Sequence, residues 1–183
     1  MTLPFTSVAV IGAGRGGWRL ALDAARAGYR VLLEDVLPSR LHSAGTEMRE
    51  EITVAAIDDP GAVLARIQFV SNVEDAVRHA DLAIDGVPDE LESKLEIFSM
   101  IDRMAPPRTI LCSPLQAVSL ADVAACTYRA SQCVGMRLEV DEILIVRATF
   151  TDSGAIDRVL QFWRSLGRQA RVITDDREFS PAN

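Results

Sequence analysis

Three glycines and one carboxylate near the N-terminus have the types and spacing to bind a dinucleotide. Gly12, Gly14 and Gly17 follow an apolar run over 8–11 in the pattern G-x-G-x-x-G, and Asp35 lies 18 residues after Gly17. In this pattern the first glycine permits a tight turn, the second lets a pyrophosphate approach the backbone, and the third lets a helix pack against a strand. The carboxylate can accept hydrogen bonds from the ribose hydroxyls of adenosine, and it would repel a 2′-phosphate. These residues predict a site for NAD in preference to NADP.

The sequence around these residues predicts the strands and the helix that must position them. An apolar strand over 8–11 leads into the glycines, a helical pattern runs from Gly14 to about Ala27, and a second apolar run over 31–33 ends at the acid. The start of such a helix offers unpaired N–H groups and the positive end of its dipole to phosphates. Arg15 in the loop could reach a phosphate or lie exposed in solvent. A tight strand-to-helix turn without a ligand is the alternative, but it does not account for the acid.

Strands alternate with helices along the rest of the chain. Further strands are expected at 67–70, 82–86, 109–112, 133–136, 142–146 and 171–174, and helices at 39–57, 61–66, 72–77, 90–105, 119–125 and 153–166. This alternation predicts an α/β, Rossmann-like fold with a doubly wound, mostly parallel sheet in three αβα layers. We expect residues 1–183 to form a single NAD-binding domain, with ligands beyond the carboxyl ends of the strands.

Composition narrows the function classes. The net charge of −7 argues against nucleic acid and anionic membranes as partners, and no stretch resembles a signal peptide or a membrane span. Cys112, Cys126 and Cys133 lack metal-ligand spacing, which favours buried reduced thiols in a cytoplasmic protein. A redox role for Cys112 is the alternative. With only His42 and His79 present, a histidine-rich metal site is excluded, and we expect no metal.

A long specific stretch, V-P-D-E-L-E-S-K over 87–94 followed by E-I-F over 96–98, carries a family resemblance. The other matching stretches are V-A-V-I-G-A-G over 8–14, G-Y-R-V over 28–31, A-D-L-A-I over 80–84, P-P-R-T-I-L over 106–111, G-M over 135–136 and L-G-R over 166–168. From about Val8 to Phe179 the sequence resembles the NAD-binding domain of the L-3-hydroxyacyl-CoA dehydrogenases. The resemblance implies NAD as cofactor.

The motif and the resemblance together give a set of expected cofactor-binding residues. They are Gly12, Gly14, Arg15, Gly16, Gly17, Asp35, Gly86, Val87, Pro88, Asp89, Lys94 and Ser113. In the family, the lysine at the position of Lys94 lies near the nicotinamide side. The alternative for Lys94 is an ordinary solvated lysine on a helix.

The same resemblance locates the family's catalytic positions, and other residues occupy them. Gln116 stands where a serine helps to bind the substrate oxygen, Arg137 where a histidine is the general base, and Leu144 where a glutamate orients that histidine. The 21-residue spacing from Gln116 to Arg137 matches the family. Oxidation of a secondary alcohol needs a base for the hydroxyl proton, and arginine is always protonated near neutral pH. No catalytic residue is therefore assigned from the sequence.

Substitute bases would have to come from Glu139, Asp141 or Glu142, each with a raised pKa. Glu142 is a weak candidate because it faces the same side of its strand as Leu144. The alternative is a solvated acidic loop. Arg137 could hold a carboxylate or phosphate by a bidentate contact, or it could pair with one of these acids and only hold the loop.

These substitutions lead to two hypotheses. The first is an NAD(H)-binding protein resembling 3-hydroxyacyl-CoA dehydrogenase, an oxidoreductase, with a small acidic or acyl-CoA substrate. The second is an NAD-binding sensor or partner subunit without dehydrogenase activity on 3-hydroxyacyl-CoA. Only 31 residues separate Asp35 from Ile67, a shorter arm than the family has, and the sequence ends where the family's helical C-terminal domain would begin. Apolar surface over 140–183 would then be uncovered, so we expect a homodimer through the C-terminal third.

Overall fold

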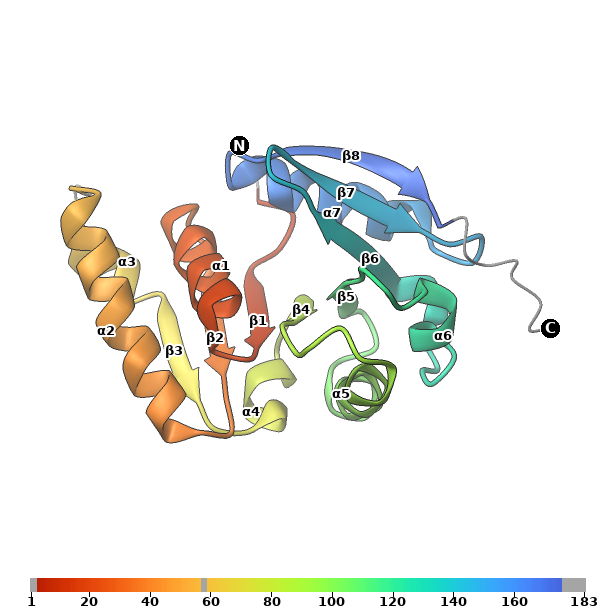
Figure 1. Cartoon of the computed structure of the whole chain (residues 1–183), viewed down its shortest axis with the longest axis horizontal. Helices are drawn as coiled ribbons and strands as arrows, with labels where there is room; N and C mark the ends of the chain where they lie inside the picture. The colour runs from red at the N-terminus through yellow and green to blue at the C-terminus, as the bar shows by residue number, and fades with distance from the viewer. Residues whose placement is uncertain (1–2, 57–58, 176–183) are drawn as a thin grey trace.

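The computed structural model describes residues 3–56 and 59–175 and contains one eight-stranded sheet (Figure 1). The strands are β1 (Ser7–Ile11), β2 (Arg30–Glu34), β3 (Ile67–Val70), β4 (Leu82–Asp85), β5 (Ile110–Pro114), β6 (Cys133–Leu138), β7 (Glu142–Arg147) and β8 (Gln169–Thr174). Their order in the sheet is β3-β2-β1-β4-β5-β6-β7-β8, and the β6–β7 pair is antiparallel while the other neighbours are parallel. The predicted Rossmann-like, doubly wound and mostly parallel fold is confirmed.

The helices lie close to their expected positions. They are α1 (Arg15–Arg26), α2 (Pro38–Val54), α3 (Pro60–Leu64), α4 (Val73–Val77), α5 (Leu91–Met104), α6 (Leu120–Ala124) and α7 (Ser153–Ser165), with a 3₁₀ turn η1 (Ala130–Gln132). The helix expected over 39–57 ends at Val54, and its residue 57 lies outside the described residues. Phe179, at the end of the family resemblance, also lies outside them. No helix in the described part of the chain is long and apolar enough to cross a membrane.

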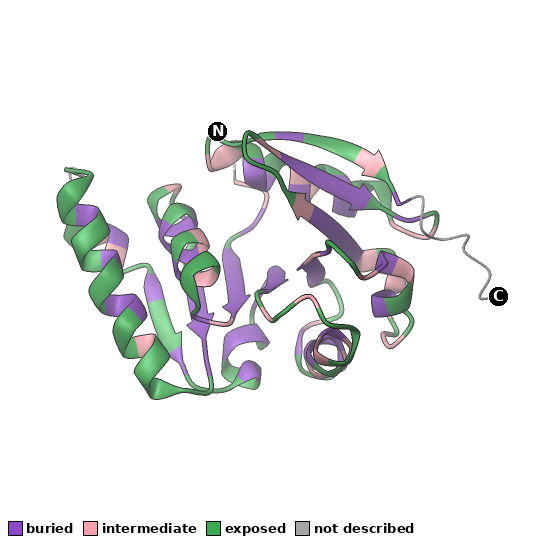
Figure 2. Ribbon diagram, in the orientation of Figure 1, coloured by how far each residue is buried: buried purple, intermediate pink, exposed green. Residues whose placement is uncertain are grey.

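One apolar core lies on each face of the sheet, between the sheet and the helices that cover that face. On one face of the sheet, buried residues of α1, α2 and α7 pack against the strands, and on the other face those of α4, α5 and α6 do so. All five residues of β1 and all four of β4 are buried, as the continuous apolar runs of parallel strands require (Figure 2). The chain order reverses between β1 and β4, so ligands are expected beyond the carboxyl ends of these two strands.

Candidate cofactor site and catalytic positions

The glycine loop lies between β1 and α1. Gly12 has a φ of +99°, which glycine adopts without strain. A Cβ on Gly17 would lie 1.9 Å from the carbonyl oxygen of Gly12, so only glycine allows α1 to start this close to the loop. A Cβ on Gly14 or Gly16 would meet no atom within 4 Å, so the loop is open on its outer side. The first N–H groups of α1 border this open space, which suits a pyrophosphate.

Asp35 joins the end of β2 to the glycine loop. The side chain is buried, and its Oδ2 accepts a hydrogen bond of 3.0 Å from the Ala13 N–H while its Oδ1 accepts one of 3.0 Å from the Leu37 N–H. Each carboxylate oxygen retains a lone pair for a further donor. Arg40 approaches Asp35 Oδ2 at 3.6 Å. Asp35 therefore shapes the loop itself, a role that sequence reasoning missed.

Three neighbours of Asp35 were also missed. Val36 and Leu37 are 70% and 46% exposed, so apolar surface lies beside the predicted ribose acid. Glu34 is buried, and its Oε1 has no hydrogen-bond partner among the described residues. Burial, reinforced by the adjacent charge of Asp35, raises the pKa of Glu34 to about 7. An acid directly after the second apolar run, in the last position of the strand, was the signal in the sequence for this buried carboxyl group.

Lys94 forms a buried polar cluster with residues at the ends of β4 and β5. Its Nζ lies 3.3 and 3.4 Å from the two carboxylate oxygens of Asp85 and 3.0 Å from Ser113 Oγ, and the Lys94 side chain is 0% exposed. Ser113 Oγ also donates to Asp85 Oδ2. Burial raises the pKa of Asp85, while Lys94 and Ser113 oppose that rise. The alternative of a solvated helix lysine is wrong, because α5 directs the Lys94 side chain toward Asp85 and Ser113 at the carboxyl ends of β4 and β5.

The loop after β4 forms hydrogen bonds with the end of β1 and with the loop after β5. Gly86 donates its N–H to the Ile11 carbonyl at 2.7 Å, and Val87 donates its N–H to Asp85 Oδ1 at 3.0 Å. Asp89, which follows Pro88, accepts hydrogen bonds at its Oδ2 from the Gln116 and Ala117 N–H groups, at 2.8 and 2.5 Å. The predicted cofactor residues after β4 thus form one connected loop that also fixes the loop after β5.

The family's two paired catalytic positions lie opposite each other. Arg137 on β6 is in register with Leu144 on β7. Arg137 forms an ion pair with Asp175, at 3.8 Å between Nη2 and Oδ1, and the buried Asp175 accepts the Leu120 N–H at 2.9 Å. Arg137 therefore pairs with the residue after β8, and of its two alternatives the one in which it pairs with Glu139, Asp141 or Glu142 is not what the structure shows.

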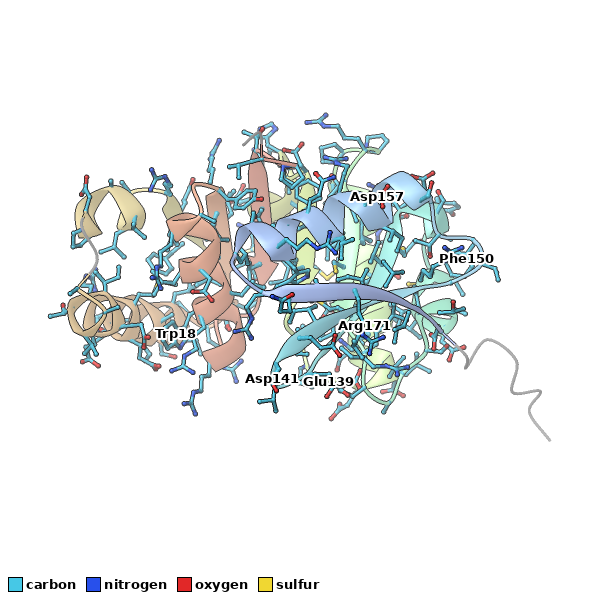
Figure 3. All side chains as sticks on the ribbon, turned by 90° about the horizontal axis from the view of Figure 1, so that it is seen from above. Trp18, Glu139, Asp141, Phe150, Asp157 and Arg171 are labelled. Atoms are coloured by element: carbon cyan, nitrogen blue, oxygen red, sulfur yellow. The ribbon has the colours of Figure 1, made fainter. Side chains whose placement is uncertain are left out.

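The three acids after β6 have different surroundings. Glu142 accepts a bidentate contact from Arg171, with distances of 2.9 and 3.2 Å to the guanidinium nitrogens. Glu139 and Asp141 are exposed in the β6–β7 turn. Figure 3 labels both of them, and it also labels Arg171 on β8. This arrangement favours the solvated acidic loop over a substitute general base.

The cysteines are free thiols in the structure. Cys112 and Cys133 are buried, and Cys126 is partly buried. Burial raises the pKa of Cys133 to about 12 and that of Cys112 well above its usual range. Because the thiolate is the reactive form, both are poor nucleophiles, which opposes the redox alternative for Cys112. Among the described residues no group of three or more His, Cys, Asp or Glu side chains could hold a metal ion.

Comparison with known proteins decides the family. The model of the 3-hydroxyacyl-CoA dehydrogenase NAD-binding domain matches residues 7–176. The chain belongs to this family. NAD is accordingly its cofactor, as the glycine motif and Asp35 predicted.

Relatives of the domain are longer than the chain. The probable 3-hydroxybutyryl-CoA dehydrogenase of Bacillus subtilis is 28% identical over an alignment of 181 positions that covers 92% of this chain and 62% of that protein. The 5-formyl-3-hydroxy-2-methylpyridine 4-carboxylate 5-dehydrogenase of Mesorhizobium japonicum is 26% identical over 178 residues, 93% of this chain and 58% of that protein. The chain thus spans about 60% of these relatives.

Solved structures confirm the fold. Mycobacterium tuberculosis FadB2 superposes with a TM-score of 0.86 at 24% identity, over 93% of this chain and 64% of that one. A 3-hydroxyacyl-CoA dehydrogenase from Archaeoglobus fulgidus superposes with a TM-score of 0.79 at 26% identity, over 94% and 58%. The matches support the 3-hydroxyacyl-CoA dehydrogenase-like fold.

Proposed function

We propose that this chain is an NAD(H)-binding module that does not oxidise 3-hydroxyacyl-CoA by the histidine mechanism of its family. The observation that carries the proposal is the pair of strand positions at Arg137 and Leu144. A guanidinium and an aliphatic side chain lie opposite each other where the family has its base and its orienting acid, and Asp175 holds the guanidinium. We infer the role of a sensor or partner subunit whose ligand is NAD or NADH.

The predicted cofactor residues fit this role. The open side of the glycine loop and the start of α1 would receive the pyrophosphate, and Asp35 would accept from the adenosine ribose. Val36 and Leu37 offer apolar surface for the base. Lys94 is buried under the loop after β4, so we infer that it supports that loop through Asp85, and its direct contact with the cofactor stays a prediction.

The missing step is proton acceptance. Bound NAD supplies a hydride acceptor, but an alcohol must also lose its hydroxyl proton to a base. Arg137 keeps its proton near neutral pH and already faces Asp175. Glu142 is engaged by Arg171. These residues bind and orient charges, and none of them is placed to take the proton as the family histidine does.

A second candidate function is reduction or oxidation of a small acidic substrate. Arg137 is 28% exposed at its side chain, and its Nε has no hydrogen-bond partner among the described residues. A guanidinium with donors to spare can hold a carboxylate by a bidentate contact. Oxidation of such a substrate would also require a group that accepts the hydroxyl proton, and reduction one that donates it; Arg137 and Glu142 are not placed to do either.

Activity measurements test the proposal. NADH oxidation with acetoacetyl-CoA, followed by absorbance, should show no turnover above the uncatalysed rate for the native chain. The Arg137→Ala and Glu142→Gln variants should likewise show no turnover above the uncatalysed rate. Turnover by the native chain that either variant abolishes would refute the proposal. Calorimetric titration with NADH on the same samples would show that the proteins bind cofactor.

Two further expectations stay proposals. We propose a homodimer through the C-terminal third, where the outer side of β8 is an edge of the sheet and Val140 and Val172 are exposed. Light scattering should then give twice the monomer mass, and a monomer at micromolar concentration would refute it. We also propose a cytoplasmic location, which fractionation of cells expressing the protein would test.

A further inference from the structure

A cleft of about 730 Å³ lies on the sheet face that α1 and α7 cover. Its walls and floor are largely apolar and include Trp18, Leu22, Met136, Leu138, Ile143 and Trp163. Part of the lining belongs to the predicted cofactor site, namely Gly14, Arg15, Gly16, Gly17, Gly86 and Val87. Its volume lies in the range of small-molecule sites.

The cleft is on the opposite side of β6 from the family's catalytic position. Side chains alternate along a strand, so Met136 and Leu138 line the cleft while Arg137 points to the other face. There Arg137 meets Asp175, which binds the first N–H of α6. A ligand in the cleft would therefore use a surface distinct from the one around Arg137.

Arginines line the cleft in a protein whose net charge is −7. They are Arg15, Arg19, Arg26 and Arg168. Arg19 and Arg26 face Glu51 and Asp23, each at 3.9 Å. The acids that line the cleft are Asp23, Glu51 and Asp85. Arg15 and Arg168 have no acidic partner within 4.0 Å among the described residues, so two guanidinium groups in the lining are left without an ion pair there.

The apolar part of the cleft is incompletely covered. Leu138 is 48% exposed, and the lining beside it includes the buried Ile143 and Trp163. An exposed leucine in a cleft that arginines also line suits a ligand that is apolar along its body and anionic at its end. Burial raises the pKa of Asp23 despite nearby Arg26 and Arg168, in agreement with low local polarity.

We propose that this cleft binds an amphipathic anion. Its apolar chain or ring system lies along Leu22, Met136, Leu138 and Trp163, and its carboxylate or phosphate is held by Arg168. The side chains that hold this ligand are not among the predicted cofactor residues, so the proposal goes beyond cofactor binding, although the cleft also borders Gly14, Arg15, Gly16, Gly17, Gly86 and Val87.

Tryptophan fluorescence tests the site directly, because Trp18 and Trp163 are the chain's two tryptophans and both line the cleft. The native chain is titrated with dodecanoate, dodecyl phosphate and dodecanol, each below its micelle concentration. Binding of both anions, with dodecanol at least about ten-fold weaker, is expected from a charge-assisted contact. Preference between the two anions tells a carboxylate ligand from a phosphate ligand.

Three variants sharpen the test. Arg168→Gln should weaken anion binding about ten-fold, and Leu138→Glu should abolish it. Arg103→Gln is the matched control, because Arg103 is exposed on α5 at the other face of the sheet, and it should bind as the native chain does.

Three results would overturn the proposal: no saturable fluorescence change, equal binding by Arg168→Gln, or dodecanol binding as tight as dodecanoate. Calorimetry with NADH is run in parallel. Loss of NADH binding alone contradicts the cofactor site, whereas loss of anion binding alone contradicts this one.

Discussion

Glu34 gives the protein a stability that depends on pH in a direction opposite to that of most carboxylates. Its pKa is raised from the ordinary value of 4.5 to about 7 because the side chain is buried beside Asp35. The folded state therefore holds this proton more tightly than the unfolded chain does. By linkage, the contribution is fully present below pH 4.5 and is lost as pH rises through about 7. That shift corresponds to up to about 3 kcal/mol.

Replacing Glu34 by glutamine removes the titration and keeps the shape. The free energy of unfolding of Glu34→Gln, relative to the native chain, should rise by up to about 3 kcal/mol between pH 5 and pH 8.5. Urea unfolding followed by circular dichroism at each pH measures this difference. Glu50→Gln, an exposed substitution on α2, is the control and should show no such trend. A pH-independent difference for Glu34→Gln, or one of opposite sign, would refute the reasoning.

Three other predictions follow from buried or close contacts. Lys94→Met should lower the free energy of unfolding, measured in urea, by about 3–5 kcal/mol, because it leaves the Asp85 charge buried and unpaired. The double variant Lys94→Met with Asp85→Asn should recover part of that stability, and no recovery would contradict a charge effect. Gly17→Ala should abolish NADH binding in calorimetry, because its Cβ would lie 1.9 Å from the Gly12 carbonyl oxygen; normal binding would show that the loop is not as close as described. Arg137→Ala should leave NADH affinity within about two-fold, since its guanidinium pairs with Asp175 and Arg137 is not among the predicted cofactor residues; a large loss would place it in the cofactor site.

The parts of the site that were predictable are local in sequence. Gly12, Gly14 and Gly17 follow a strand and start a helix within a few residues, so their spacing encodes the turn itself. Asp35 ends the next strand, and parallel pairing of β1 with β2 brings it beside that turn. Alternating apolar runs and helical periods likewise predicted the strands and helices of the sheet.

The parts that were missed depend on packing between distant segments. Lys94 is buried because α5 places it against Asp85 and Ser113, and helical periodicity alone leaves a lysine at that position free to be solvated. The Arg137–Asp175 pair joins β6 to the residue after β8, 38 positions later. Arg137 lies in a family motif but Asp175 does not, so only the sheet order could show that the two side chains meet.

The cleft was unpredictable for the same reason. Its walls come from α1, β6, β7 and α7, and its existence depends on how far α1 and α7 stand apart over the sheet. The extent of one domain over 1–183 stays a prediction, as do the individual cofactor contacts. The cofactor contacts were inferred from motif spacing and from the family resemblance, and the structure shows an arrangement of these residues that is compatible with binding NAD.

Cofactor binding with discrimination at Asp35 tests the central claim most directly. Calorimetry should show one NADH per chain, with NADP(H) at least about ten-fold weaker because its 2′-phosphate would meet the Asp35 carboxylate. Asp35→Asn keeps a hydrogen-bond acceptor for the Ala13 N–H and removes the charge, so it should narrow that preference. Absence of NADH binding by the native chain, or tighter binding of NADPH, would contradict the account.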